Sequence, residues 1–185
     1  MDCEIVHSPP SPFCPAPQWW HSLNISSTEI EVSEFIGGLV RLTQPEICVE
    51  TGSYHGQTSK IIGEALKKNG HGRLYSLEVN EGYLNEARFQ CSQLPAEFIL
   101  RSAEHWTPPG NIDFLYLDSG GDRFIEFEHY LPYLKSGSVF CLHDTRPENP
   151  VQFAYEMFLK IKGHSHLFEG IEFHSPRGLW VGRMK

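Results

Sequence analysis

The sequence lacks an excess of basic residues. Its 185 residues include 15 lysines and arginines against 23 aspartates and glutamates, which gives a formal net charge of −8 at pH 7. Because a protein that acts mainly by binding phosphate backbones needs a large basic surface, this balance argues against nucleic acid as the principal partner. The chain also lacks an apolar run approaching the roughly 20 residues that span a bilayer, so we expect no membrane partner.

Cysteine pairs and targeting signals are also missing. The five cysteines are odd in number and form no C-x-x-C pair, which argues against a disulfide framework and against a zinc knuckle. Residues 1–11 lack the basic and apolar regions of a signal peptide. These absences together favour a cytoplasmic protein. With hydrophobic residues at 40%, the length suits one packed domain.

Proline is concentrated near the N-terminus. Residues 8–17 hold five prolines, a density that is incompatible with a helix and favours extended backbone. We therefore interpret residues 1–26 as an arm or lid and residues 27–185 as the functional domain. The adjacent Trp19 and Trp20 are costly to expose to water, so we expect both to be buried against the domain or in a pocket wall.

Strand-like and helical segments alternate beyond the arm. A helix is expected from Ser27 to Pro45, with Ser27 or Thr28 as its cap and Glu31 completing a capping box. Strands follow at 46–50, 73–79, 96–100, 112–118 and 138–142, helices at 57–68, 81–94, 123–134 and 151–162, and two closing strands at 170–173 and 178–183. Pro132 must end or kink the last turn of the helix at 123–134. Strands separated by helices favour right-handed crossovers and a parallel sheet covered on both faces. The predicted fold class is α/β, doubly wound, with an antiparallel strand at one edge.

One strand end carries a glycine-containing turn. Glu50, Gly52 and Gly56 lie between an expected strand and the next helix, where glycines permit close backbone approach and the helix start offers free N–H groups. Glu78 ends the following strand, 22 residues beyond Gly56, at the offset of an acid that binds both hydroxyls of a ribose. The combination predicts a nucleoside ligand beyond the carboxyl ends of the strands.

The same turn lacks the G-x-G-x-x-G spacing that is typical of dinucleotide sites. It places the acid Glu50 just before the glycines instead, where a carboxylate would repel a diphosphate but suit a cationic ligand such as a sulfonium amino acid. A nicotinamide-dependent oxidoreductase is therefore the less favoured alternative.

The segment from Val49 to Ser59 resembles the first motif of class I S-adenosylmethionine-dependent methyltransferases, and in particular the small O-methyltransferase-like group called methyltransferase family 24. The resemblance extends from about Ser27 to the C-terminus. It implies a Rossmann-like seven-stranded sheet in the order 3-2-1-4-5-7-6, with the last strand antiparallel. Tyr54 stands where many members have a middle glycine, a change that this group tolerates.

The resemblance also implies a set of cofactor-binding residues. Glu50, Gly52, Ser53 and Gly56 would surround the methionine part of S-adenosylmethionine, Glu78 would hold the ribose, Ser102 and Ala103 would border the adenine, and Asp118 would complete the site. The implied activity is O-methylation of a small-molecule acceptor, and a non-catalytic S-adenosylmethionine-binding module is the alternative. Because so short a chain leaves little room for a recognition insert, the acceptor pocket must be built from the arm, the 145–150 loop or the second subunit of a homodimer.

Asp118, His143 and Asp144 end two strands that are adjacent in the expected sheet. Two converging carboxylates could bind Mg²⁺ or another divalent cation, which would orient an acceptor hydroxyl and lower its pKa. Related catechol-type enzymes have an acid at the position of Asp118 and an Asp-Asn pair at that of Asp144 and Thr145, so threonine replaces the asparagine here. If no metal binds, His143 is the preferred general base, because neutral imidazole suits proton transfer near pH 7. Strand alternation would send His143 and Asp144 to opposite faces unless the strand ends there.

Overall fold

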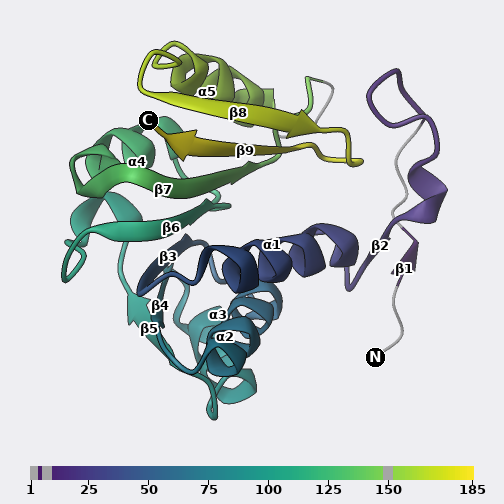
Figure 1. Cartoon of the computed structure of the whole chain (residues 1–185). Helices are drawn as coiled ribbons and strands as arrows, with labels where there is room; N and C mark the ends of the chain where they lie inside the picture. The colour runs from purple at the N-terminus through teal and green to yellow at the C-terminus, as the bar shows by residue number, and fades with distance from the viewer. Residues whose placement is uncertain (1–3, 6–9, 148–151) are drawn as a thin grey trace.

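One seven-stranded sheet forms the centre of the molecule (Figure 1). The computed structural model describes residues 4–5, 10–147 and 152–185. The strands are β3 Ile47–Thr51, β4 Arg73–Glu78, β5 Ala96–Leu100, β6 Ile112–Leu117, β7 Leu134–His143, β8 Phe168–Phe173 and β9 Leu179–Met184. Their order is β5-β4-β3-β6-β7-β9-β8. Counted along the chain from β3, this is 3-2-1-4-5-7-6, which confirms the predicted fold.

The pairing of the strands brings their carboxyl ends to one edge. Strands β3 to β7 pair in parallel, whereas β9 pairs antiparallel with both β7 and β8. Thr51, at the end of β3, lies opposite Leu77 on one side and Leu117 on the other, and Leu117 lies opposite Leu142. Four neighbouring strands therefore end level with one another, at the edge where sheets of this kind bind ligands.

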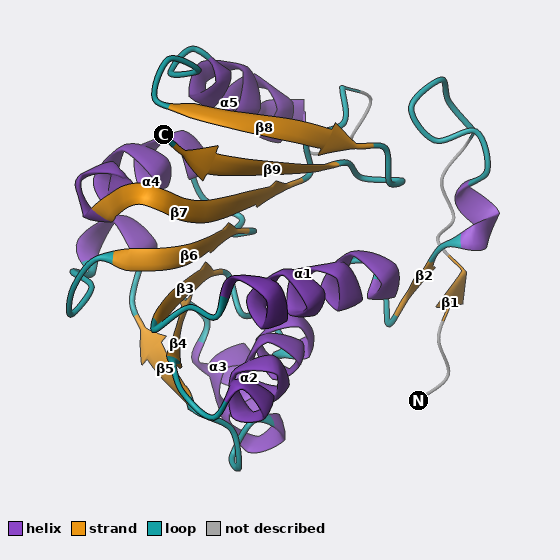
Figure 2. Ribbon diagram, viewed as in Figure 1, coloured by secondary structure: helices purple, strands orange, loops and turns teal. Residues whose placement is uncertain are grey.

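Helices cover both faces of the sheet (Figure 2). One face carries α1 Ile30–Thr43, α2 Gln57–Asn69 and α3 Glu81–Gln90, and the other carries α4 Arg123–Tyr130 and α5 Gln152–Lys162. Cys48 packs into the core cluster beneath α1 and α2, and its neighbour Val49 packs into the cluster beneath α4 and α5. Successive side chains of a strand point to opposite faces, so a central strand that is covered on both sides must be apolar throughout. In the described part of the chain, no helix is long and apolar enough to span a membrane.

Helix α1 begins later than the sequence predicts. It starts at Ile30 rather than Ser27, and no side chain caps its N-terminus. Glu31 does not close a capping box, because its carboxylate accepts a hydrogen bond from the backbone N–H of His21 at 3.1 Å and lies 2.7 Å from the His21 ring. Residues 27–29 are buried, and their polar groups contact the site described below.

Several other boundaries differ from prediction, and β8, for example, starts at Phe168 rather than at residue 170. Helix α4 ends at Tyr130 and continues as the 3₁₀ helix η3 Leu131–Tyr133, which confirms the predicted break at Pro132, a residue that cannot donate the hydrogen bond that an α-helix requires. Helix α3 ends at Gln90 rather than at residue 94. Strand β7 starts at Leu134 rather than at residue 138. The predicted start of the last helix, residue 151, lies outside the described residues.

The N-terminal arm carries a small sheet of its own. Strand β1 Glu4–Ile5 pairs antiparallel with β2 His21–Ser22, and the 3₁₀ helix η1 Pro17–Trp19 precedes β2. Trp20 packs against the core cluster beneath α1, whereas Trp19 is 74% exposed. The prediction that both tryptophans are buried is therefore wrong for Trp19, and of the two only Trp20 packs on the domain.

Candidate functional site

The loops after β3 and β6 touch at the carboxyl edge of the sheet. A Cβ atom placed on Gly52 would lie 2.7 Å from the Cα atom of Ser119 and 2.8 Å from the carbonyl oxygen of Asp118. Gly52 also has a φ of +83°, a backbone conformation that strongly favours glycine. Its N–H and that of Ser53 donate hydrogen bonds to the carbonyl oxygen of Leu77, at 2.9 and 3.1 Å. The turn is therefore fixed between the ends of β4 and β6, as the glycine pattern predicts.

Glu50 lies beneath this turn and is buried. Its Oε2 atom accepts hydrogen bonds from the hydroxyl of Ser76, at 2.6 Å, and from that of Ser59. Burial raises the pKa of Glu50 to about 7, although the two hydroxyl groups oppose the shift. A carboxylate with such a pKa gains its charge readily when a cation is placed beside it, because the opposite charge favours the ionised form.

Glu78 ends β4 and is half-buried. Its Oε2 atom accepts a hydrogen bond from the backbone N–H of Tyr54, and Oε1 accepts from the N–H groups of Val79 and Asn80, each at 2.9 Å. A carboxylate has about four lone-pair sites, so it retains acceptor capacity for ligand hydroxyls. These backbone hydrogen bonds hold the carboxylate in one orientation. One of the donors, Tyr54, is two residues after Gly52, so the carboxylate lies beside the turn.

The remaining predicted cofactor residues line the same edge. Ser102 precedes the 3₁₀ helix η2 Ala103–His105, which follows β5. Ala103 is buried, and its carbonyl oxygen accepts a hydrogen bond from the hydroxyl of Tyr130 at 2.8 Å. Gly56 has a φ of +85° and lies so close to Ala87 that a Cβ atom would be 2.7 Å from the Ala87 Cα atom.

The Ser53 hydroxyl provides a test of whether this edge fits a polar cofactor. It is buried, and it has no hydrogen-bond partner among the described residues. Buried polar groups in folded proteins nearly always have a partner, and a hydroxyl at the turn between Gly52 and Gly56 is placed to take one from a ligand. The donor and acceptor set of the turn therefore fits the methionine part of S-adenosylmethionine.

The strand-end acids and His143 lie together in the structure. Among the described residues, Asp118, His143 and Asp144 form the group whose potential ligand atoms lie within 4.8 Å of one another. Strand β7 ends at His143, and Asp144 has a left-handed φ of +62°. This turn of the backbone brings the two neighbouring side chains into one cluster, where a continuing strand would have separated them.

His143 is fully buried between carboxylates. Its Nε2 atom lies 2.7 Å from Oε2 of Glu29, and its Nδ1 atom lies 3.0 Å from Oδ1 of Asp118. Burial would lower the pKa of the imidazole, but the negative charges of Asp118, Asp144 and Glu29 raise it to about 10. A general base needs a free lone pair near the operating pH, and in this arrangement both ring nitrogens are engaged.

Two arginines complete the cluster, and sequence analysis did not single out either. Arg123 opens α4, and its guanidinium donates to Oδ2 of Asp144 at 2.8 Å and to the carbonyl oxygen of His143 at 2.6 Å. Arg177 lies in the turn between β8 and β9, and its Nε atom donates to Oδ1 of Asp144 at 2.6 Å. Burial would raise the pKa of Asp144, but His143, Arg123 and Arg177 hold it well below its usual range.

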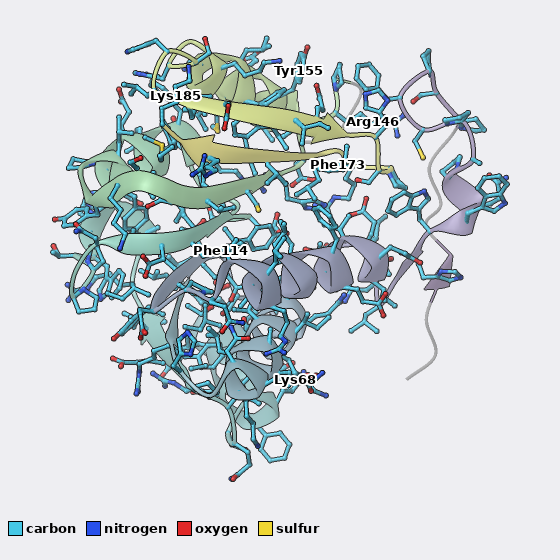
Figure 3. The ribbon with its side chains drawn as sticks, in the orientation of Figure 1. Lys68, Phe114, Arg146, Tyr155, Phe173 and Lys185 are labelled. Atoms are coloured by element: carbon cyan, nitrogen blue, oxygen red, sulfur yellow. The ribbon has the colours of Figure 1, made fainter. Side chains whose placement is uncertain are left out.

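The segment before α1 closes the cluster from the other side. The Thr28 hydroxyl donates to Oδ2 of Asp118 at 2.7 Å, and Oε1 of Glu29 accepts from the backbone N–H of Arg177 at 2.9 Å. Arg146 lies beside the β8–β9 turn (Figure 3) and donates from Nη1 to the carbonyl oxygen of Pro176 at 2.6 Å. Local sequence signals gave Thr28 a capping role, because nothing local shows that Asp118 is its partner.

A surface groove lies away from this edge. Its volume is about 430 Å³, and it is lined by the start of β4 at Arg73, the start of β5 at Ala96, and the end of α3 at Arg88. Starts of parallel strands lie at the opposite edge from their carboxyl ends. The groove is therefore separate from the candidate site.

Comparisons with known proteins agree with the geometry. Residues 49–145 match the family model described as a methyltransferase domain. The fold is similar to that of an O-methyltransferase from Bacillus cereus in complex with SAH, with 16% identity, coverage of 88% of this chain and 84% of that chain, and a TM-score of 0.73. It is also similar to the O-methyltransferase TomG from Streptomyces achromogenes, involved in tomaymycin synthesis, in complex with SAM, with 18% identity, 88% and 83% coverage, and a TM-score of 0.70. The SAH-bound methyltransferase PaMTH1 from Podospora anserina gives 15% identity, 86% and 80% coverage, and a TM-score of 0.72.

Proposed function

Because the chain belongs to the methyltransferase-domain family and is an S-adenosylmethionine-dependent methyltransferase, we propose that its acceptor is a hydroxyl group of a small molecule. The level array of strand ends, with the Gly52 turn fixed between β4 and β6, is the observation that carries the cofactor site in this proposal. Structural neighbours that are named O-methyltransferases support oxygen as the methylated atom. The family match leaves no support for a nicotinamide-dependent oxidoreductase.

Residues of the Gly52 turn would hold the methionine part of the cofactor. In this proposal the Gly52 backbone permits close approach, the Ser53 hydroxyl supplies a hydrogen bond, and the Glu50 carboxylate below the turn attracts positive charge. Gly56 allows the turn to pack against α3. When bound, S-adenosylmethionine supplies an electrophilic methyl group on a sulfonium ion.

The other strand ends would hold the nucleoside. Glu78 is oriented by three backbone N–H groups and can accept hydrogen bonds from ribose hydroxyls. Ser102 and Ala103 would border the adenine, since they follow β5, which lies next to β4 in the sheet. Asp118 would form the opposite wall, because the Gly52 turn contacts its carbonyl oxygen.

The acceptor in this proposal is a hydroxyl that ionises near neutral pH. Both nitrogens of His143 are engaged, and the adjacent carboxylates are paired with arginines, so the cluster offers no free base. Alignment of an already ionised oxygen with the methyl group, together with exclusion of water, then suffices for in-line displacement. The arm is a candidate cover for the acceptor, because the Phe13 ring lies 5.0 Å from that of His174 beside the β8–β9 turn.

Incubation with labelled S-adenosylmethionine and a small-molecule extract tests the proposal. We expect label in products with acidic hydroxyl groups, and calorimetry should show binding of the cofactor and of its demethylated product. Tight binding without transfer of label to any compound would instead identify a non-catalytic binding module. Label on nitrogen or carbon alone would overturn the assignment of a hydroxyl acceptor. The predicted homodimer stays a prediction, which size-exclusion chromatography with light scattering tests.

A further inference from the structure

We propose that the guanidinium groups of Arg123 and Arg177 take the place of a divalent cation between Asp118 and Asp144. Asp118, His143 and Asp144, which are the candidate metal ligands, would then form a cluster that needs no metal ion. This inference rests on the contacts of the described residues. Only its activity measurement depends on the proposed function.

Asp144 is held by both arginines. Arg177 donates from Nε to Oδ1 at 2.6 Å and from Nη2 to Oδ2 at 3.1 Å, which is the two-point geometry in which a planar guanidinium best matches a carboxylate. Arg123 donates from Nη2 to Oδ2 at 2.8 Å. Both oxygens that a cation would need are therefore already bound to positively charged donors.

Asp118 is equally saturated. Its Oδ1 atom lies 3.3 Å from Nη2 of Arg123 and 3.0 Å from Nδ1 of His143. Its Oδ2 atom accepts hydrogen bonds from the hydroxyls of Thr28, at 2.7 Å, and Tyr116, at 3.0 Å. Each oxygen of this carboxylate thus has two partners, whereas a hard cation such as Mg²⁺ requires free oxygen ligands in near-octahedral geometry.

Asp118 and Asp144 already lie opposite positively charged side chains without a metal ion. Two guanidinium ions face two aspartates, and the side chains of Arg123 and Asp144 are only 5% and 1% exposed. A divalent cation at this position would have to share these oxygens with two guanidinium ions. The three positive groups would repel one another, because screening by water is weak in a buried cluster. The repulsion that two adjacent carboxylates would suffer alone is removed by the arginines.

The fold fixes both arginines in place. Arg123 is the first residue of α4, and its Nε atom also donates to the carbonyl oxygen of Ser119 at 2.7 Å. The turn that carries Arg177 packs directly on the loop that follows β7, since a Cβ atom on Gly178 would lie 2.6 Å from the backbone nitrogen of Arg146. Displacing either side chain to admit a cation would therefore disturb the backbone of the site.

Binding of Mn²⁺ to the wild-type protein tests the proposal directly. We expect electron paramagnetic resonance to show no bound Mn²⁺ at millimolar concentrations, and the Tm to be the same with MnCl₂, MgCl₂ or EDTA. Saturable Mn²⁺ binding that Asp144→Asn abolishes would overturn the proposal. Methyl transfer, once an acceptor is known, should be unchanged in EDTA, and absence of any transfer would count against the proposed function alone.

Removal of one arginine should create the missing cation site. We expect Arg177→Met to lower the Tm, and Mn²⁺ to restore part of the loss, because Asp144 then loses both hydrogen bonds from Arg177. The matched control is Arg183→Met, which removes an exposed arginine paired with Glu169. Its Tm should stay close to that of the wild type and should not change with Mn²⁺. If Arg177→Met does not fold, Arg177→Lys keeps the charge but loses the two-point contact and should show the same response more weakly. If the variant folds and Mn²⁺ leaves its Tm unchanged, the proposal that arginine takes the place of a metal ion is contradicted.

Discussion

Nε2 of His143 lies 2.7 Å from Oε2 of Glu29, a residue 114 positions earlier in the chain. Both side chains are fully buried, so the contact joins the segment before α1 to the end of β7 without help from solvent. Burial would raise the pKa of Glu29, but the positive charge of His143 lowers it. The pair is therefore ionised on both sides, and it connects two parts of the candidate site that are far apart in the sequence.

Removal of one member of this pair should be strongly destabilising. We expect Glu29→Gln to lower the free energy of unfolding by about 3–5 kcal/mol, because it leaves a buried charge without its partner. The matched control is Glu31→Gln two residues later, which removes an exposed pair with His21 and should cost less than about 1 kcal/mol. Urea denaturation of both variants measures the difference, and equal losses would contradict the buried pairing.

His143 should make stability depend on pH in the alkaline range. The pKa of the imidazole is raised from 6.5 in the unfolded chain to about 10 in the folded chain. The folded state therefore binds the proton more tightly, and the stabilisation is fully present below pH 6.5 and is lost as pH rises through about 10. Urea titrations between pH 6 and 10 should show this decline in the wild type and a flatter profile in His143→Gln.

The same shift predicts the pH profile of methyl transfer. A histidine general base would give a limb near its ordinary pKa of about 6.5. Because His143 is charged and engaged on both nitrogens, we expect it to give no such limb, and any limb near neutral pH should come from the acceptor and persist in His143→Gln. A limb near pH 6.5 that disappears in His143→Gln, with a loss of rate of about 10²–10⁴-fold, would restore His143 as the base.

Glu50 should also make stability decline as pH rises, but over a lower pH range. Burial raises its pKa from 4.5 to about 7, so the folded chain without ligand holds a proton that the unfolded chain has released. Stability should consequently fall by about 3 kcal/mol as pH rises from 4.5 to 7, and Glu50→Gln should remove this fall. A cation bound at the turn would expel the proton, so calorimetry near pH 6 in two buffers should show proton release in the wild type only. Identical apparent enthalpies in both buffers would contradict a contact between Glu50 and the cationic ligand.

The elements that position the site could be predicted because their signals are local. The apolar run of β3, the glycines at 52 and 56, and the acid at the end of β4 lie within one strand–turn–helix–strand unit, and each retains its predicted place. The level strand ends then follow from parallel pairing. The family match over residues 49–145 confirms the resemblance on which the cofactor assignment depends.

The charge partners of the cluster could not be predicted in the same way. Glu29 and Arg177 are 148 positions apart, and the backbone N–H of Arg177 donates to the carboxylate of Glu29 only in the folded chain. Locally, Glu29 looks like part of a helix start and Arg177 like a turn residue. The one usable signal was physical, because two acids at adjacent strand ends require positive charge between them. The two acids therefore predict that a positive charge lies between them. They do not indicate whether a metal ion or an arginine supplies that charge.

A matched pair of glycine substitutions tests the Gly52 turn. Gly52→Ala places a Cβ atom 2.7 Å from backbone of the neighbouring loop at a φ of +83°, so we expect loss of cofactor binding and a stability loss of more than about 1 kcal/mol. Gly38→Ala lies on an open face of α1, where a Cβ atom meets nothing within 4 Å, and should stabilise by about 0.5–1 kcal/mol. Thermal denaturation and calorimetry measure both effects. A Gly52→Ala protein that binds the cofactor normally would show that the turn is not part of the site.

Glu78→Ala should separate ribose recognition from the rest of the cofactor site. The substitution removes the acceptor for ribose hydroxyls, and we expect the binding free energy of S-adenosylmethionine to weaken by about 1–3 kcal/mol, the usual cost of unpaired polar groups. Because the same carboxylate also accepts three backbone N–H bonds, Glu78→Gln provides a second measurement that keeps one acceptor oxygen and should lose less affinity.

Glu97→Ala, which removes an exposed acid paired with Arg73 on the next strand, is the matched control and should leave affinity unchanged. If methionine inhibits binding equally in all variants while adenosine competes less well only against Glu78→Ala, the loss lies at the ribose. Equal affinity of Glu78→Ala and the wild type for S-adenosylmethionine would remove Glu78 from the site.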